Sequence, residues 1–372
     1  MLTLAYGESD LPKIIRAAVV VTTRKMEIQT FDAPEINEDD GLLRVEMCGV
    51  CGSDPRIYNW TEPHRFPLIM GHELVGHIER LGSRAAARWR VQVGDRVIVE
   101  HLFGCGHCHW CLLGEYRFCK EHQGYGGTTP SSVPPHLWGA YSQYMYLAPN
   151  SRVHRISEDV PAEAAAMTCA NIGNGLRWVR TKGGAAIGDN VVVIGPGGQG
   201  LAAILAANEA GASKIIVVGL TRDQHRFELS KLFGATHIIN LDHEDPVEAV
   251  LELTDGVLAD LVVDLTGATA SFPLALDLAR PLGVVVVGSN TGAQEVAIVP
   301  SKIPIKELRV QGVNTHDTPA VQAAIKIVES RRYPIEKMVT HHFPLAQAET
   351  AVLAAAGEIE LDGFIKGVIV PN

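Results

Sequence analysis

Four cysteines stand close together in the segment GCGHCHWCLLGEYRFC, which spans residues 104–119. They are separated by two, two and seven residues and are Cys105, Cys108, Cys111 and Cys119. Thiolates at these spacings suit the tetrahedral coordination of zinc, and two successive C-x-x-C steps cannot easily pair with themselves as disulfides. Because four sulfurs leave no open position for a substrate, the pattern predicts a structural zinc site.

A second group of possible metal ligands lies in two earlier motifs. Cys51 belongs to CGVCGSD, and His72 precedes Glu73 in MGHELVG. A thiolate, an imidazole and a carboxylate from separate loops can hold a catalytic zinc that keeps one position open for a substrate oxygen. Cys169 is the candidate third protein ligand, and Glu163, six residues earlier, is the alternative.

A glycine-rich turn lies between an apolar run and an alanine-rich run in residues 190–219. Gly195, Gly197 and Gly200 form G-x-G-x-x-G, with Gly198 inside the motif. The first glycine allows a tight turn, the second lets the backbone approach a pyrophosphate, and the third lets helix and strand pack closely. The segment therefore predicts a βαβ unit that binds a dinucleotide, with NAD or NADP as the cofactor.

The end of the second strand of this unit normally decides between NAD and NADP, because a carboxylate there holds the ribose diol. Here the residue is Gly219, and the following loop offers Arg222 for a 2′-phosphate and Asp223 as a displaced acid for the diol. The loop leaves the choice open and favours NAD slightly. A solvated charged loop is the alternative reading.

These residues need two kinds of scaffold. From Arg16 to about Pro149 short apolar runs alternate with Gly, Pro and Asp, which indicates an all-β domain with long loops. The expected strands lie within 41–50, 72–82, 94–102 and 141–149. Residues 122–139 are rich in Gly, Ser, Thr and Pro and are expected to form a surface excursion, in which Trp138 either lines a pocket or wedges at the surface.

After Asp159 helical and apolar strand patterns alternate. Asp159 can cap a helix that has Pro161 in its first turn. Helices are expected at 225–235, 245–254 and 272–283, and strands at 236–240, 259–267 and 284–290. Strands this apolar are buried on both faces, so the pattern predicts a doubly wound parallel sheet. Beyond about Leu308 mixed helices and strands return.

Together these motifs resemble the zinc-dependent medium-chain alcohol dehydrogenase family, over essentially all residues from Arg16 to Asn372. The resemblance implies an α/β fold made of a GroES-like β-barrel catalytic domain and a doubly wound Rossmann domain. The catalytic domain is expected at 1–165 and 310–372, with the structural zinc lobe at about 104–120. The dinucleotide-binding domain is expected at 166–309.

The resemblance also assigns roles to single residues. Cys51, His72 and Cys169 match the family's catalytic zinc ligands, and Glu73 matches a neighbouring carboxylate that can approach the metal. Ser53 matches the hydroxyl that passes on the proton of the alcohol. Lys366, in GFIKG, resembles a basic residue near the pyrophosphate, with a solvent-facing strand lysine as the alternative.

One departure from the family concerns the proton relay. Many members have a histidine a few residues after the serine, whereas this chain has Pro55 and Arg56. Proton exit is then expected through water or the cofactor ribose. Arg56 is expected to form a structural salt bridge rather than to contact the substrate. Another departure is the absence of a threonine after Cys169.

Composition limits the possible partners and location. The net charge is −10 and the basic residues form no clustered stripe, so neither nucleic acid nor an anionic membrane is an expected partner. No apolar run reaches the length of a membrane span, and the first ten residues lack the positive start of a signal peptide. Seven cysteines, an odd number, fit a reducing compartment. A cytoplasmic location is therefore expected.

The sequence as a whole predicts a zinc-dependent oxidoreductase that moves a hydride between an alcohol and NAD(P). A primary alcohol, a secondary alcohol or a polyol would give the aldehyde or ketone. The alternatives are an aldehyde or formaldehyde-type reductase of the same family and a non-catalytic dinucleotide-binding structural or sensor protein. Two zinc ions per chain are expected, and the resemblance implies a homodimer or homotetramer.

Overall fold

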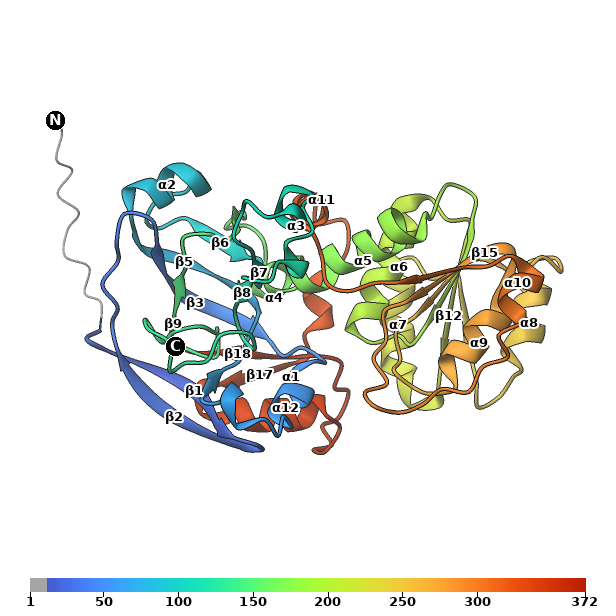
Figure 1. Ribbon diagram of the computed structural model, residues 1–372. Coiled ribbons are helices and arrows are strands. Elements are labelled where there is room, and N and C mark those ends of the chain that lie inside the picture. The colour runs from blue at the N-terminus through green and yellow to red at the C-terminus, as the bar shows by residue number, and fades with distance from the viewer. Residues whose placement is uncertain (1–11) are drawn as a thin grey trace. The chain divides into compact units, whose positions relative to one another are not determined.

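The computed structural model describes residues 12–372 and divides into two compact units (Figure 1). The first unit ends at Met167 and resumes at 339–372, and the second is continuous from Thr168 to Met338. Most of the predicted extension at residues 1–15 lies outside the described residues. None of the described helices is long and apolar enough to cross a membrane.

The first unit is built mainly on antiparallel strands, as its alternating apolar runs predict, and among its described strands only His341–Pro344 and Gly367–Val370 pair in parallel. Its largest sheet has the order β10-β6-β5-β3-β18-β17, with β9 also paired to β3. These strands are β3 (Gly41–Gly49), β5 (Glu73–Leu81), β6 (Arg96–Val99), β9 (Tyr144–Leu147), β10 (Val153–Arg155), β17 (His341–Pro344) and β18 (Gly367–Val370). A second sheet has the order β2-β1-β4, with β1 (Ile14–Thr22), β2 (Lys25–Asp32) and β4 (Leu68–Ile69).

Short helices and a small hairpin complete this unit. The helices are α1 (Asp54–Tyr58), α2 (Ser83–Trp89), α3 (His109–Leu112), α4 (Ala162–Ala166) and α12 (Ala348–Ala355). Strands β7 (Leu102–Phe103) and β8 (Gln123–Gly124) pair on either side of the four-cysteine segment. One apolar core joins the sheets and α12, so residues 339–372 fold with the N-terminal part of the chain.

Part of the segment 122–139, which the sequence suggested as a surface excursion, is buried in the core of this unit. Trp138 is only 4% exposed and belongs to the main core of this unit. Its ring stacks on Tyr125 and meets Tyr146 edge-on, while its Nε1 donates to the carbonyl of Val133 at 2.8 Å. Of the two expectations for Trp138, the surface aromatic is therefore wrong, because Tyr125, Tyr146 and the surrounding core bury the indole.

The second unit contains the predicted parallel sheet. Its six strands have the order β13-β12-β11-β14-β15-β16, and every neighbouring pair is parallel. The strands are β11 (Asn190–Ile194), β12 (Lys214–Gly219), β13 (His237–Asn240), β14 (Ala259–Asp264), β15 (Ala279–Val287) and β16 (Arg309–Gly312). The central strands are buried on both faces, as their continuous apolar runs require.

Helices cover both faces of this sheet, so the fold is doubly wound (Figure 1). One group lies against β11 and β12 and includes α6 (Gly198–Ala210) and α7 (Gln224–Leu232). The other group packs on β13, β14 and β15 and comprises α8 (Pro246–Leu253), α9 (Ser271–Leu278) and α10 (Lys302–Lys306). The remaining helices are α5 (Asn174–Leu176) and α11 (Thr318–Glu329).

Two boundaries differ from the expected ones. The helix expected at 272–283 ends at Leu278, because residues from Ala279 onward pair with β14 as part of β15. The sequence placed the return to the first domain at about residue 310, whereas contacts group residues 310–338 with the second unit. There β16 extends the parallel sheet beside β15, and α11 packs on residues 168–173.

Candidate functional site

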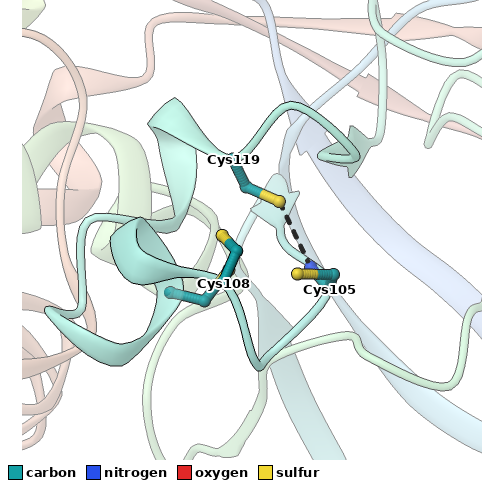
Figure 2. Close-up of side chains that lie close together, drawn as sticks. Cys105, Cys108 and Cys119 are labelled. Atoms are coloured by element: carbon teal, nitrogen blue, oxygen red, sulfur yellow. Dashed lines mark hydrogen bonds between the residues drawn. The ribbon is translucent and has the colours of Figure 1, made fainter.

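The four cysteines at 104–119 converge in the first unit. Their sulfur atoms all lie within 4.8 Å of one another, and Figure 2 shows Cys105, Cys108 and Cys119 around a common centre. The backbone N–H of Cys105 points at the sulfur of Cys119 across 3.5 Å. A β-carbon at Gly104 would lie 2.4 Å from the sulfur of Cys111, so a glycine is needed for the chain to pass this cluster.

The cluster fits a zinc ion by its donor set and its electrostatics. A tetrahedral zinc with bonds of about 2.3 Å keeps its sulfurs about 3.8 Å apart, which the clustered atoms can reach with small shifts. The backbone N–H of His107 donates to the thiol of Cys105 and lowers its pKa to about 6, while burial raises the pKa of Cys111 to about 12. A cation among the sulfurs would favour the thiolate form of all four.

Cys51 and His72 also meet, although 20 residues separate the loops that carry them. Their side chains share a hydrogen bond, and the hydroxyl oxygen of Ser53 lies 3.4 Å from Nε2 of the imidazole. Cys51 and Ser53 lie in the turn that enters α1, and His72 immediately precedes β5. The structure therefore brings together the thiolate, the imidazole and the hydroxyl that the sequence selected.

The carboxylate of Asp54 contacts both the imidazole of His72 and the backbone of Cys51. Its Oδ1 lies 3.7 Å from Nδ1 of His72, and its Oδ2 accepts hydrogen bonds from the Tyr141 hydroxyl at 2.7 Å and the Cys51 N–H at 2.8 Å. Asp54 has no exposed surface, and burial raises its pKa although these neighbours oppose the shift. Since Oδ1 makes no hydrogen bond within the described residues, the electrostatic contact with His72 is its main interaction.

Glu73 lies beside a basic residue from the other end of the chain. Nζ of Lys366 is 2.6 Å from Oε2 of Glu73 and donates to the carbonyl of Val50 at 3.1 Å. Lys366 is 6% exposed, so it is not the solvent-facing lysine that was one of the two sequence expectations. Burial alone would lower its pKa, but the negative charges of Glu73, Cys51 and Asp54 and the hydrogen bond to Glu73 together outweigh burial and raise the pKa.

The charges around His72 favour a bound cation. Burial lowers the pKa of this imidazole, but the negative charges of Cys51, Asp54 and Glu73 outweigh the burial and raise the pKa to about 10. Several acidic groups thus surround one side chain that is neutral when it binds a metal. A divalent ion on Cys51 and Nε2 of His72 would satisfy the same negative field, so these residues fit a zinc ion.

Three further residues complete the account of the predicted site. Cys169 belongs to the second unit, where it is 2% exposed within the π-helical turns at Thr168–Gly173. Glu163, the alternative ligand, bonds Nε2 of His342 at 2.9 Å in the first unit. Arg56 is exposed and forms no ion pair with any described residue, so the expected salt bridge stays a prediction.

Two residues near the site were missed in the sequence. The ring of His101 lies 5.3 Å from that of His72, centroid to centroid, and the hydroxyl of Tyr141 donates to Asp54. Neither residue stands at a recognisable spacing from CGVCGSD or MGHELVG. The only signal in the sequence was that both residues lie in runs expected to be strands, at 94–102 and 141–149.

The glycine turn of the second unit has the geometry expected for a dinucleotide. Gly195 has φ +94, and a β-carbon at Gly200 would lie 2.0 Å from the carbonyl oxygen of Gly195. At Gly197 a β-carbon would meet nothing within 4 Å. Helix α6 begins at Gly198 without a side-chain cap, so its first N–H groups are left for a phosphate. The turn therefore fits the pyrophosphate of a nicotinamide dinucleotide.

A thiolate and imidazole site on a GroES-like unit, a four-cysteine lobe and a dinucleotide turn on a parallel sheet define a zinc-containing, NAD(P)-dependent oxidoreductase. Comparison with known families agrees. Residues 37–158 match the alcohol dehydrogenase GroES-like domain, and residues 198–330 match the zinc-binding dehydrogenase domain. The chain belongs to the zinc-containing medium-chain alcohol dehydrogenase family.

Relatives extend over nearly the whole chain. A probable alcohol dehydrogenase of Mycobacterium tuberculosis is 40% identical over 364 residues, covering 96% of this chain and 99% of that protein. An erythritol/L-threitol dehydrogenase of Mycolicibacterium smegmatis is 31% identical and covers 94% and 97%. The crystal structure of an alcohol dehydrogenase from Thermotoga maritima superposes with a TM-score of 0.87 at 24% identity, over 96% of this chain and all of that one. That last likeness concerns the fold.

The class of reaction predicted from the sequence is thereby confirmed. The chain is a zinc-dependent oxidoreductase that transfers a hydride between an alcohol and NAD(P), and its substrates are small-molecule alcohols. The predicted fold class is confirmed as well, with a GroES-like unit and a parallel six-stranded sheet.

Proposed function

We propose that the chain carries two zinc ions with separate tasks. Cys51, His72 and Cys169 would bind the catalytic ion, and the four cysteines at 104–119 would bind a structural ion. The observation that carries this proposal is the meeting of Cys51, Ser53 and the imidazole of His72 in the first unit. The four sulfurs of the other cluster would fill a tetrahedral coordination sphere and leave no position for a substrate, which supports its structural role.

The two bound groups would supply the chemistry that side chains cannot. Zinc supplies a Lewis acid that lowers the pKa of the alcohol hydroxyl, and the nicotinamide ring accepts the hydride. The residues of the chain then have three tasks. They orient the ligands, receive the proton of the alcohol, and keep the charges of the site balanced.

Ser53 is the residue we assign to the proton. Its hydroxyl lies 3.4 Å from Nε2 of His72, one of the residues that would hold the catalytic ion. The hydroxyl can accept the proton of the alcohol while it donates its own proton onward. Because Pro55 and Arg56 replace the usual histidine, the next acceptor is water or a cofactor ribose hydroxyl.

Asp54 and Lys366 would act through their neighbours. Asp54 faces Nδ1 of His72 and therefore orients Nε2 as the nitrogen with a free lone pair. Lys366 was assigned to the pyrophosphate by resemblance, but its burial against Glu73 supports a local task. In this role the ammonium group of Lys366 fixes the position of the Glu73 carboxylate relative to the metal ligands.

Polyols and secondary alcohols are the substrates we expect first. Among the relatives, an erythritol/L-threitol dehydrogenase is 31% identical and a sorbitol dehydrogenase of Bacillus subtilis is 30% identical. These names describe those proteins and support the choice for this chain. The test is to compare kcat/KM for erythritol, threitol, sorbitol, a simple secondary alcohol and a primary alcohol of similar size. Higher values for the primary alcohol would contradict the expectation.

Metal analysis tests the assignment of the two ions. The purified chain should contain two zinc ions, and Cys51→Ser should contain one, lose turnover and keep its thermal stability. A matched change, Cys48→Ser, removes a buried thiol three residues earlier that we do not assign to zinc. That variant should keep both ions. A single zinc in the unaltered chain, or loss of both from Cys51→Ser, would count against the proposal.

Two broader expectations from the resemblance and the composition complete the proposal. The protein would form a homodimer or homotetramer, which light scattering of the purified chain can measure. It would work in the cytoplasm, where free thiols of the proposed zinc sites stay reduced, and cell fractionation tests this location.

A further inference from the structure

The loop after β12 carries information on the choice between NAD and NADP. Strand β12 ends at Gly219, which lies about 20 residues beyond the glycine turn, at the place where the adenosine ribose is recognised in this fold. A carboxylate at this place accepts hydrogen bonds from the ribose 2′-hydroxyl, whereas an arginine nearby accommodates a 2′-phosphate. The argument rests on the proposed dinucleotide site and concerns which dinucleotide it takes.

The structure leaves no room for a carboxylate at the end of β12. A β-carbon at Gly219 would lie 2.7 Å from Cε1 and 2.9 Å from Cζ of Phe227, whose ring is buried. It would also lie 3.2 Å from Oδ2 of Asp223. Any side chain at this position would therefore need the core under α7 to shift. The glycine thus reflects close packing between strand and helix.

The two acids near this loop are engaged in shaping it. Asp223 is buried, and its Oδ2 accepts the N–H of Leu220 at 3.1 Å while its Oδ1 pairs with Arg226 at 2.7 Å. Asp242, which follows β13, accepts the N–H of Thr221 at 2.8 Å. Both carboxylates thus hold consecutive backbone N–H groups of the loop. Both oxygens of Asp223 and Oδ2 of Asp242 are therefore engaged within the protein, so neither carboxylate offers two free oxygens to a ribose diol.

Arg222 is the basic residue of the short turn at Thr221–Asp223. Its side chain is exposed, and no hydrogen bond or ion pair to it occurs among residues 12–372. The carboxylate of Asp242 accepts the backbone N–H of the neighbouring Thr221, which lowers the pKa of that carboxyl, and the positive charge of Arg222 adds to this shift. The loop therefore presents a guanidinium that makes no hydrogen bond within the described residues, on a backbone that two carboxylates hold in place. Such a group matches the geometry and charge of a phosphate.

We propose that the chain binds NADP(H) in preference to NAD(H), with the guanidinium of Arg222 on the 2′-phosphate. The slight preference for NAD in the sequence depended on Asp223 as a displaced acceptor for the diol. The structure commits that carboxylate to Leu220 and Arg226. With Gly219 unable to carry a side chain, the 2′-phosphate is the ribose substituent for which this loop has a partner.

Binding measurements on the zinc-loaded protein test the inference without any turnover. Isothermal titration should show that adenosine 2′,5′-bisphosphate and NADPH bind at least about tenfold more tightly than 5′-ADP and NADH. Arg222→Gln should weaken the two 2′-phosphorylated ligands by roughly 10- to 100-fold, the range for a lost charge-assisted hydrogen bond. It should leave 5′-ADP and NADH within about twofold.

A matched control is Lys231→Gln, which removes the same charge from the exposed face of α7. It should leave all four affinities unchanged. Equal or tighter binding of NADH by the unaltered chain would overturn the inference, as would Arg222→Gln that binds adenosine 2′,5′-bisphosphate normally. If the protein binds NADPH preferentially but oxidises no alcohol, the inference stands and the proposed active site fails.

Discussion

Oδ1 of Asp54 lies 3.7 Å from Nδ1 of His72, and both side chains are buried. The carboxylate is anchored through its other oxygen by Tyr141 and by the N–H of Cys51. Asp54 therefore links the two proposed metal ligands of the first unit, one through its imidazole and the other through its backbone. The orientation of the imidazole is decided by a residue that need not touch the substrate.

Asp54→Asn should weaken zinc binding at the catalytic site and lower kcat/KM by about 10- to 100-fold. An amide has the same shape but lacks the charge that fixes the tautomer of His72. The measurement is a competition titration with a zinc chelator alongside steady-state kinetics.

Tyr141→Phe serves as the control for Asp54→Asn. It removes one hydrogen bond to Asp54 and should cost about 1 kcal/mol of stability. The charge remains, so zinc affinity should fall less than in Asp54→Asn. The positioning role would be refuted if both variants retained zinc equally well.

Lys366→Met should destabilise the first unit by about 3–5 kcal/mol, because it leaves the carboxylate of Glu73 buried without its cationic partner. Lys366→Arg should recover part of this loss. Chemical denaturation at neutral pH measures both. If Lys366→Met unfolds at the same denaturant concentration as the unaltered chain, the pair contributes nothing to stability.

The glycine turn should separate effects on folding from effects on binding. Gly200→Ala should destabilise the second unit, because its β-carbon would lie 2.0 Å from the backbone oxygen of Gly195. Gly197→Ala should fold normally, since its β-carbon meets nothing within 4 Å, but should bind NADPH less tightly. Thermal melting and fluorescence titration with NADPH report the two properties. Equal melting temperatures for the two variants would contradict the steric clash expected at Gly200.

Cys105→Ser should lower thermal stability more than it lowers the specific activity of the molecules that remain folded. The reason is that the closed four-sulfur cluster ties β7, α3 and the adjoining loop through a metal ion rather than through a large core. A chelator that strips this ion should produce the same loss in the unaltered protein. Loss of turnover before any loss of stability would point to a catalytic role for the lobe.

Asp39 should make a pH-dependent contribution to stability. Hydrogen bonds from Arg84 and Arg88 lower the pKa of this carboxyl to about 2. A carboxyl with a depressed pKa stabilises the fold above its unfolded pKa of about 4, and this contribution disappears as the pH falls from about 4 toward 2. Asp39→Asn should therefore melt below the unaltered chain at pH 7, and the difference should shrink toward pH 3. A difference that is constant with pH would contradict this account.

Much of the fold and part of the site could be predicted from the sequence because they depend on local patterns. The apolar runs at Asn190–Ile194 and Lys214–Gly219 are continuous, and buried parallel strands require that continuity. The four cysteines at 104–119 lie close enough in the chain that short loops bring them together. Gly195 and Gly200 were recognisable because a positive φ and a close backbone approach need a residue without a β-carbon.

Long-range packing decided the rest. Lys366 reaches Glu73 only because β18 pairs with β3, which joins segments about 300 residues apart in sequence. Trp138 is buried by aromatic side chains that no local spacing connects to it. The sequence left Asp223 available to a ribose, but in the structure its carboxylate accepts the N–H of Leu220 in the turn after β12. Periodicity and spacing constrain neighbours along the chain, whereas the partner of a buried charge depends on which strands the completed sheet places side by side.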